Sequence, residues 1–366
     1  MIKVTLTNEI LRYITEIEQN RYKVSSVKLS KTVMNKLRKN SKKKSSYASN
    51  KIEGNPLSEK QVDEVIESDE KKHYLKPEQE VRNYFLALNY LEEKVSKKER
   101  FSMKLILDVQ KLVEKGASKE KIGLRGPMPP GVLFAVYDSK TGNPDYIPPE
   151  YCDIPGLLNE LVEYVNTTDD HPLIVAAVVH YQLVTIHPFE DGNGRTARLL
   201  SGYIMDLNGY GFNGIGSLEE YFAYDIDEYY ESIQMGLPAL YYSGRENPPH
   251  PEIWINYFLR MVKLYSGKVC DLQLASEEED ITGSLSFLKG KEKELLQFLI
   301  KNYKGEFTPI EVSRKLSVTN KTIINRLMVL VKNGFVVPIL VNKRIRFYEL
   351  SEFTRDHEKE IMKAIG

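Results

Sequence analysis

The segment 186–198, with the sequence IHPFEDGNGRTAR, combines a histidine, two acidic residues, two glycines and two arginines. Gly192 and Gly194 allow unusual backbone dihedrals and a close approach to a ligand. The free amide groups at the start of a following helix form a site for anions. Arg195 and Arg198 lie three residues apart on one side of that helix, and guanidinium groups bind phosphate oxygens well. These residue types therefore favour phosphate chemistry.

Two further side chains of this segment could take part in a reaction at a phosphate. Asp191 suits Mg²⁺, which commonly takes one or two protein carboxylates together with phosphate oxygens. His187, with an ordinary pKa of about 6.5, can accept a proton from an attacking hydroxyl near neutral pH. Each residue alone has a structural explanation, since an isolated Asp-Gly-Asn-Gly is usually a turn. The combination indicates a catalytic site.

Helical periodicity surrounds the segment and predicts the elements that position it. Apolar spacing predicts helices over 173–186, 196–208, 226–236 and 252–266. Pro188 should end the first of them, because the residue before a proline is disfavoured in the α region. Residues 123–149 contain six prolines and four glycines around a β-rich run, which predicts a hairpin or flap. The core is therefore expected to be mainly α.

Composition sets the broad class of protein. The 366 residues are 42% hydrophobic and 28% charged, which is typical of two or three globular domains. The 51 Lys and Arg balance the 51 Asp and Glu, so net charge does not favour nucleic acid or membrane. Cys152 and Cys270 are too few for a disulfide framework or a zinc cluster. With no apolar signal core at the N-terminus and no apolar run near ~20 residues, we expect a cytoplasmic protein without a membrane helix.

The segment 186–198 resembles the signature of Fic-domain proteins, His-Pro-Phe-x-Asp/Glu-Gly-Asn-Gly/Lys-Arg-x-x-Arg, at every fixed position. The resemblance covers roughly residues 40–265, and it implies a helical core with a flap, which residues 131–146 resemble. It also implies transfer of AMP from ATP to a Ser, Thr or Tyr hydroxyl of a target protein. His187 would be the general base and Asp191 would hold Mg²⁺. The residues that the resemblance assigns to the nucleotide phosphates are Gly192, Asn193, Gly194, Arg195 and Arg198.

One position departs from the pattern of the family. Members often carry an Asn-Arg pair just before a later Tyr-Tyr, near the base of the nucleotide, whereas Asp225 and Ile226 precede that stretch here. The resemblance therefore does not extend to these residues near the base. His171 and His180 lack the spacing of a zinc finger or a metalloprotease helix, so we interpret both as structural residues.

The segment 49–54 resembles the inhibitory motif of the same family, Ser/Thr-x-x-x-Glu-Gly/Asn. Ser49 and Glu53 would lie on one helical face, and Gly54 can end that helix. The resemblance implies that Glu53 pairs with Arg198 and so removes the guanidinium that the γ-phosphate needs. The alternative is an ordinary solvated carboxylate on a surface helix.

Residues 291–350 have the pattern of three helices followed by two strands, which resembles a winged helix-turn-helix. Such modules bind DNA in some proteins and other proteins elsewhere, so both alternatives remain open. The candidate DNA-binding residues are Lys321, Asn325 and Arg326 on the third helix, and Lys343 and Arg344 between the strands.

The expected domains are an N-terminal helical region over 1–95, which carries the inhibitory motif 49–54, a Fic catalytic core over 96–270, a linker over 271–290 and the winged module over 291–366. The linker is placed there because the stretch has little helical periodicity. Expected partners are ATP and a target protein, with DNA and a second copy of the chain as open alternatives. Two other functions also remain open, namely removal of AMP from a modified protein and a DNA-binding regulator with a Fic sensor domain.

Overall fold

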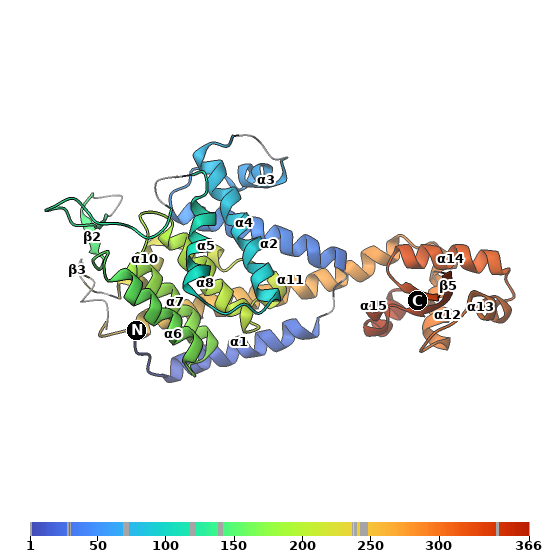
Figure 1. Cartoon of the computed structure of the whole chain (residues 1–366). Coiled ribbons are helices and arrows are strands. Elements are labelled where there is room, and N and C mark those ends of the chain that lie inside the picture. The colour runs from blue at the N-terminus through green and yellow to red at the C-terminus, as the bar shows by residue number, and fades with distance from the viewer. Residues whose placement is uncertain are drawn as a thin grey trace. The chain divides into compact units, whose positions relative to one another are not determined.

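The computed structural model describes residues 2–27, 29, 31–68, 73–117, 122–137, 142–235, 237, 240, 241, 248–341 and 344–365 (Figure 1). These residues are mainly helical, as the sequence predicts. The chain forms two compact units, one of residues 1–22 and 37–269 and the other of residues 23–36 and 270–366. No helix in the described part of the chain is long and apolar enough to cross a membrane.

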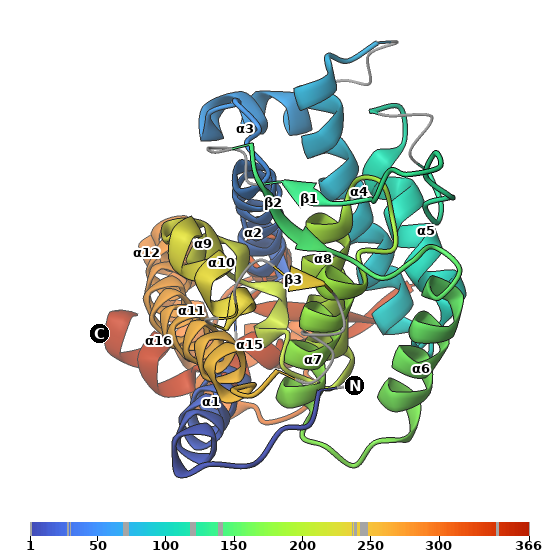
Figure 2. The ribbon, with the colours of Figure 1, turned by 90° about the vertical axis from the view of Figure 1, so that its left-hand side faces the viewer.

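The first unit is a set of helices around a central pair. The helices that lie wholly or partly in this unit are α1 (Asn8–Ser26), α2 (Lys31–Ile52), α3 (Glu59–Glu67), α4 (Lys76–Ser96), α5 (Met103–Glu114), α6 (Ile154–Thr167), α7 (Pro172–Ile186), α8 (Asn193–Leu207), α9 (Glu219–Tyr224), α10 (Ile226–Gln234) and α11 (Glu252–Ser286). All residues of α7 from Leu173 to Leu183 are buried, and α7 lies beside α8 (Figure 2). α4 and α5 pack against α8. The loop between α7 and α8 is therefore held at both ends by the core.

The bounds of the central helices show how proline and glycine act on the chain. α7 ends at Ile186, as Pro188 predicts, and His187 turns the chain with a left-handed φ of 49°. α8 begins at Asn193, earlier than the predicted start at residue 196. Gly192 precedes it with a φ of 82°, a conformation that glycine adopts readily. The anion site at the start of α8 is thus closer to His187 in sequence than predicted.

The hairpin predicted within 123–149 is confirmed. Strand β1 (Val136–Tyr137) pairs antiparallel with β2 (Pro144–Ile147). A further strand, β3 (Leu240–Tyr241), joins β2 in parallel, which gives the order β1-β2-β3. The sequence did not predict β3, because a strand of two residues has no periodicity to detect.

The helix predicted over 252–266 is longer in the structure. α11 runs from Glu252 to Ser286. Residues 271–286 of the expected linker are therefore helical, although their sequence has little helical periodicity. The acidic run 277–280 interrupts the apolar spacing on which that expectation rested. Glutamate is nevertheless a good helix former, so loss of periodicity there did not mean loss of helix.

The second unit continues with helices, a two-stranded sheet and two further helices. Its elements after α11 are α12 (Gly290–Asn302), α13 (Pro309–Leu316), α14 (Asn320–Lys332), β4 (Val336–Val341), β5 (Arg344–Leu350), α15 (Glu352–Asp356) and α16 (Glu358–Ile365). Thr308 and Thr319 cap α13 and α14 through their side chains. β4 and β5 pair antiparallel. α15 and α16 were not predicted, and α16 packs against α12.

Candidate active site

The loop between α7 and α8 is closed by one asparagine side chain. Asn193 Oδ1 accepts a hydrogen bond of 3.0 Å from the backbone N–H of Phe189, and Asn193 Nδ2 donates one of 2.9 Å to the Phe189 carbonyl. Phe189 and Asn193 are both buried. The clasp fixes the intervening residues 190–192, so the backbone of the loop is set before any ligand arrives.

Replacement of Asn193 by Ala is expected to lower the free energy of unfolding of the first unit by about 2–3 kcal/mol, because a buried donor and a buried acceptor lose their partners. Asn193→Asp, which keeps the acceptor for Phe189 N–H, should cost less. The measurement is denaturant unfolding of the full chain followed by the fluorescence of Trp254, the single tryptophan, which is buried in this unit. Equal midpoints for the Ala variant and the parent would show that the clasp contributes little.

His187 lies at the start of this loop with one ring nitrogen already engaged. Its Nδ1 is 3.2 Å from the carbonyl oxygen of Val184, and a carbonyl can only accept, so Nδ1 carries the hydrogen. Burial lowers the pKa of the His187 imidazole to about 4. The ring is therefore neutral at pH 7, and Nε2 keeps the lone pair that a general base needs.

An arginine that the sequence did not single out supports His187 from the hairpin side. Arg125 donates from Nε to the His187 carbonyl at 2.8 Å, and its backbone N–H donates to Pro188 at 2.9 Å. Its guanidinium lies 4.6 Å from the ring centre of Phe134, which in turn is 5.9 Å from the ring of His187. Phe134 belongs to the predicted flap, so the hairpin region borders the candidate base.

Arg198 is fully engaged by the segment that resembles the inhibitory motif. Its Nε donates to Ser49 Oγ at 2.8 Å and its Nη2 to the Ser49 carbonyl at 3.0 Å. Nη2 also meets Glu53 Oε1 at 2.6 Å, and the Arg198 side chain is only 1% exposed. α2 ends at Ile52 and Gly54 has a φ of 79°, as the motif predicts. The structure therefore brings together Ser49, Glu53 and Arg198.

The Glu53 carboxylate also lies against the first turn of α8. A Cβ added at Gly194 would lie 2.4 Å from Glu53 Oε1 and 3.1 Å from Arg198 Nη1. A larger residue at this position would force the Glu53 carboxylate to move. The start of a helix attracts anions, so the carboxylate lies where a phosphate oxygen would be favoured.

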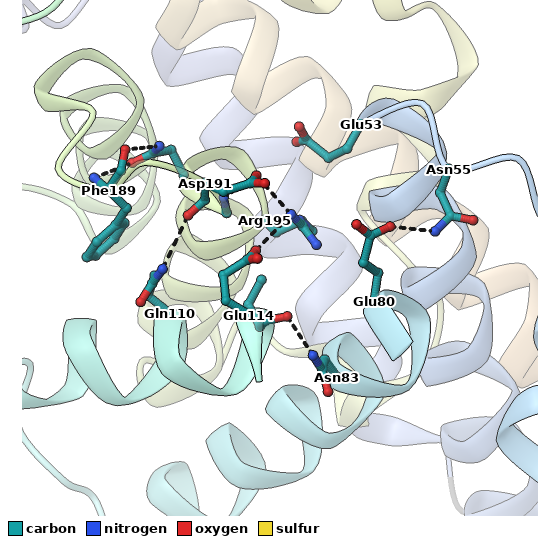
Figure 3. A network of polar contacts seen from close by, with 12 residues as sticks. Glu53, Asn55, Glu80, Asn83, Gln110, Glu114, Phe189, Asp191 and Arg195 are labelled. Carbon is teal, nitrogen blue, oxygen red and sulfur yellow. Dashed lines mark hydrogen bonds and ion pairs between the residues drawn. The ribbon is translucent and has the colours of Figure 1, made fainter. Parts of the chain in front are cut away.

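A second ion-pair group surrounds Asp191 (Figure 3). Asp191 Oδ1 accepts from the Gly192 backbone N–H at 2.7 Å and faces Arg195 Nη2 at 3.2 Å. The same Nη2 is 2.8 Å from Glu114 Oε1. Burial raises the pKa of the Glu114 carboxyl to about 7, although Arg195 acts in the opposite direction. The sequence reasoning missed Glu114, which lies outside the loop segment on α5.

The donor chemistry at Asp191 fits Mg²⁺. Its side chain is 31% exposed, and one carboxylate is enough for an ion that keeps several waters and binds phosphates. Among the described residues, no three His, Cys, Asp or Glu side chains form a ready-made metal cluster. The predicted site is therefore one that a nucleotide would have to complete.

The two other histidines considered in the sequence have structural roles. His180 is buried, and its Nε2 lies 2.8 Å from the Tyr229 hydroxyl, which accepts a 3.4 Å hydrogen bond from Arg198 Nη1. His171 caps α7, since its Nδ1 accepts from the Leu173 backbone N–H at 3.3 Å. His180 and Tyr229 thus hold the far side of Arg198, a link that no sequence motif indicated.

The candidate DNA-binding residues lie in the second unit. Lys321 and Asn325 are exposed on α14 and Arg326 is partly exposed, on the side away from the buried Ile323 and Leu327. Lys343 lies outside the described residues, and so does the side chain of Arg344.

Comparison with protein families shows which family the loop and its neighbouring helices resemble. Residues 100–205 match the model of the Fic/DOC family, a range that includes α7, the loop and nearly all of α8. These residues match a Fic domain. The segment 49–54 and the second unit lie outside the matched residues.

Curated relatives match about half of this chain. One from Drosophila grimshawi, named protein adenylyltransferase Fic, is 27% identical over 206 residues, which are 54% of this chain and 40% of the relative. One of the same name from Aedes aegypti is 29% identical over 202 residues, which are 53% of this chain and 38% of the relative. The matched region thus spans about two fifths of these relatives.

Solved structures agree with the fold of the Fic domain. A Fic family protein from Desulfovibrio desulfuricans G20 has a TM-score of 0.61 at 18% identity, covering 96% of this chain and 98% of that one. Residues 134–508 of Fic-1 from C. elegans have a TM-score of 0.56 at 24% identity, covering 73% of this chain and 72% of that one. The mainly helical fold predicted from the sequence is confirmed.

Proposed function

We propose that this protein transfers AMP from ATP to a Ser, Thr or Tyr hydroxyl of a target protein. The observation that carries the proposal is the match of residues 100–205 to the Fic/DOC family, with His187, Asp191, Arg195 and Arg198 gathered around the start of α8. The name of the curated relatives, protein adenylyltransferase Fic, supports the same reaction class.

His187 acts as the general base in this proposal. The target hydroxyl loses its proton to Nε2, and its oxygen forms a bond to the α-phosphorus of ATP. The bond between that phosphorus and the bridging oxygen of the β-phosphate breaks, and pyrophosphate leaves. The neutral imidazole, with Nδ1–H held by Val184, is prepared for this step.

The start of α8 binds the nucleotide in this proposal. The backbone N–H of Gly194 and the guanidinium of Arg198 supply donors for phosphate oxygens. Gly192, whose own N–H donates to Asp191, provides the left-handed turn that opens α8. Asn193 supports them by fixing the loop, and Arg195 adds positive charge beside Asp191. When bound at Asp191, Mg²⁺ would offset the negative charge of the phosphates.

Glu53 inhibits this reaction in our proposal. Its carboxylate holds Arg198 at 2.6 Å and lies beside Gly194, where it competes with phosphate for the same donors. ATP that enters with Glu53 in place would lack the arginine and take an unproductive pose. The conformation described here is therefore an inhibited one.

The proposal is tested by incubating the full chain and its Glu53→Gly variant with labelled ATP and Mg²⁺. Mass spectrometry should then detect AMP on a hydroxyl side chain of the protein itself or of an added lysate protein. If neither the parent chain nor Glu53→Gly forms the adduct, but either releases AMP from a previously modified protein, the reverse reaction is favoured. Absence of both activities would contradict an enzymatic role and favour a sensor.

The second unit has a separate candidate function in DNA binding. The order of α12, α13, α14, β4 and β5 supports a winged helix-turn-helix, with Lys321 and Asn325 exposed on α14. Met328 is also 62% exposed on that helix, and Leu340 is 63% exposed on β4, which would suit contacts with a protein instead.

If this unit binds DNA, affinity of the full chain for duplex DNA should fall steeply with salt, because cationic side chains would displace counterions from phosphates. Joint replacement of Lys321 and Arg326 by Ala should weaken binding and reduce the salt slope by about two. Lys359→Ala in α16 is the matched control of charge. A mobility-shift assay without binding at low salt would favour a protein partner.

Location in the cytoplasm and self-association of the chain are two further parts of this proposal. Cys152 is exposed, Cys270 is buried and neither forms a disulfide, which suits a reducing compartment where ATP is available.

A further inference from the structure

The helix α5 places two buried polar side chains against the loop between α7 and α8. Gln110 and Glu114 are one turn apart, and each is 0% exposed. Gln110 donates from Nε2 to the Asp191 carbonyl at 3.3 Å and accepts from the Gly123 backbone N–H at 3.0 Å. Gln110 therefore supports the backbone of the loop, whereas Glu114 meets a side chain, that of Arg195.

Glu114 and Arg195 form a buried pair with unused hydrogen-bonding capacity. Glu114 Oε1 is 2.8 Å from Arg195 Nη2, but neither carboxylate oxygen has an aligned donor among the described residues. Arg195 Nε and Nη1 likewise have no acceptor in that set, and Arg195 is 3% exposed. A buried ion pair that is incompletely hydrogen-bonded is weak evidence for stabilisation. A role in positioning the neighbouring groups explains it better.

The third member of this group is Asp191. Arg195 Nη2 lies between the two carboxylates, 2.8 Å from Glu114 and 3.2 Å from Asp191, as Figure 3 shows. Glu114 is thus the nearer partner of the shared nitrogen. Any cation that binds Asp191 must compete with Arg195 for the carboxylate, and the contact with Glu114 lessens that competition.

The backbone of the loop also lies close to the Glu114 carboxylate. A Cβ added at Gly192 would lie 2.7 Å from Glu114 Oε1 and 3.3 Å from Val113 Cγ1. The loop therefore touches α5 at the residue that opens α8. Movement of the Glu114 carboxylate would therefore change the contacts of Arg195 and of the backbone beside Asp191.

We propose that Glu114 is a positioning residue that shares Arg195 with Asp191 and weakens the hold of Arg195 on that carboxylate, so that Asp191 can bind the divalent cation of the nucleotide. This inference rests on the proposed function, because it assumes that a cation accompanies ATP. Without the Glu114 charge, Arg195 would pair with Asp191 alone. Its positive charge would then oppose a cation at the same carboxylate.

The test measures cation binding without turnover. In a His187→Ala, Glu53→Gly background with a non-hydrolysable ATP analogue, Mn²⁺ affinity is measured by electron paramagnetic resonance at a pH well above the pKa of Glu114. Glu114→Gln is expected to weaken Mn²⁺ binding about tenfold, as is typical for residues that orient metal ligands. The matched control is Glu80→Gln. Glu80 is another acidic side chain of this region, but its described partners are Asn55 and Lys76.

Activity gives a second readout in the Glu53→Gly background. Glu114→Gln should raise the Mg²⁺ concentration at half-maximal rate about tenfold and change the rate at saturating Mg²⁺ much less. If no variant transfers AMP, the proposed function fails while the Mn²⁺ result still tests Glu114. If Glu114→Gln does not fold, Glu114→Asp tests the same contact, because it keeps the charge but withdraws it from Arg195.

The Arg195→Met variant shows whether Glu114 affects cation binding through Arg195 or acts on the cation directly. Adding Glu114→Gln to Arg195→Met should leave Mn²⁺ affinity unchanged, because the group that Glu114 restrains is already absent. A further loss in the double variant would overturn the proposal, and so would equal weakening by Glu80→Gln. Parental Mn²⁺ affinity in the folded Glu114 variant would overturn it as well.

Discussion

Replacement of Glu53 by Gly is expected to raise AMP incorporation about a hundredfold at fixed ATP and Mg²⁺. Glu53 Oε1 lies 2.6 Å from Arg198 Nη2; the arginine side chain is 1% exposed and the glutamate side chain 33% exposed, so solvent screens the pair from the glutamate side only. If this contact biases the site by ~2.7 kcal/mol, its removal shifts the productive pose by that factor. The rate of AMP incorporation by the full chain, followed by mass spectrometry, measures the effect.

Three control variants separate charge from shape in this experiment. Glu53→Gln keeps the size of the side chain and loses the charge, so it should activate in the same direction as Gly. The double replacement of Glu53 and Arg198 should not be hyperactive, because the freed arginine is missing. Ser49→Ala should have a smaller effect, since the Ser49 carbonyl still accepts from Nη2. Equal rates for the parent and Glu53→Gly would show that the contact between Glu53 and Arg198 does not inhibit the reaction.

Replacement of His187 by Ala is expected to lower transfer by about a thousandfold and to leave ATP affinity nearly unchanged. Nε2 acts on the incoming hydroxyl, whereas the phosphates are bound by the start of α8 and by Arg198. The rate is measured in the Glu53→Gly background, and ATP binding by calorimetry. Turnover within tenfold of the parent would contradict the role of base.

The pH dependence of the same reaction gives a further check on His187. Burial lowers the pKa of this group to about 4, so the neutral, basic form predominates at every pH well above that value. The contribution of His187 should stay constant from neutral pH down to mildly acidic pH, and it is lost as pH falls through about 4. The profile is recorded at saturating Mg²⁺, where loss of the Glu114 charge changes the rate much less. A loss of rate centred near the ordinary histidine pKa of about 6.5 would then contradict this environment.

Local sequence was enough to predict the loop and its neighbours. Pro188 ends α7, Gly192 and Gly194 open the start of α8, and Ser49 and Glu53 are separated by one helical turn. Each of these predictions depends on residues within a few positions of one another. The dihedral limits of proline and glycine and the helical repeat act over that range, so the sequence determined them.

Tertiary structure alone decided which distant residues complete the site. Arg198 and Glu53 are 145 residues apart, and only the motif resemblance suggested that they meet. Glu114, Arg125 and Tyr229 reach the same region from α5, from the stretch before β1 and from α10, and no local pattern marked them. Their positions depend on how buried helices pack around α7 and α8, which is fixed by the shape of side chains from the whole unit rather than by neighbours in sequence.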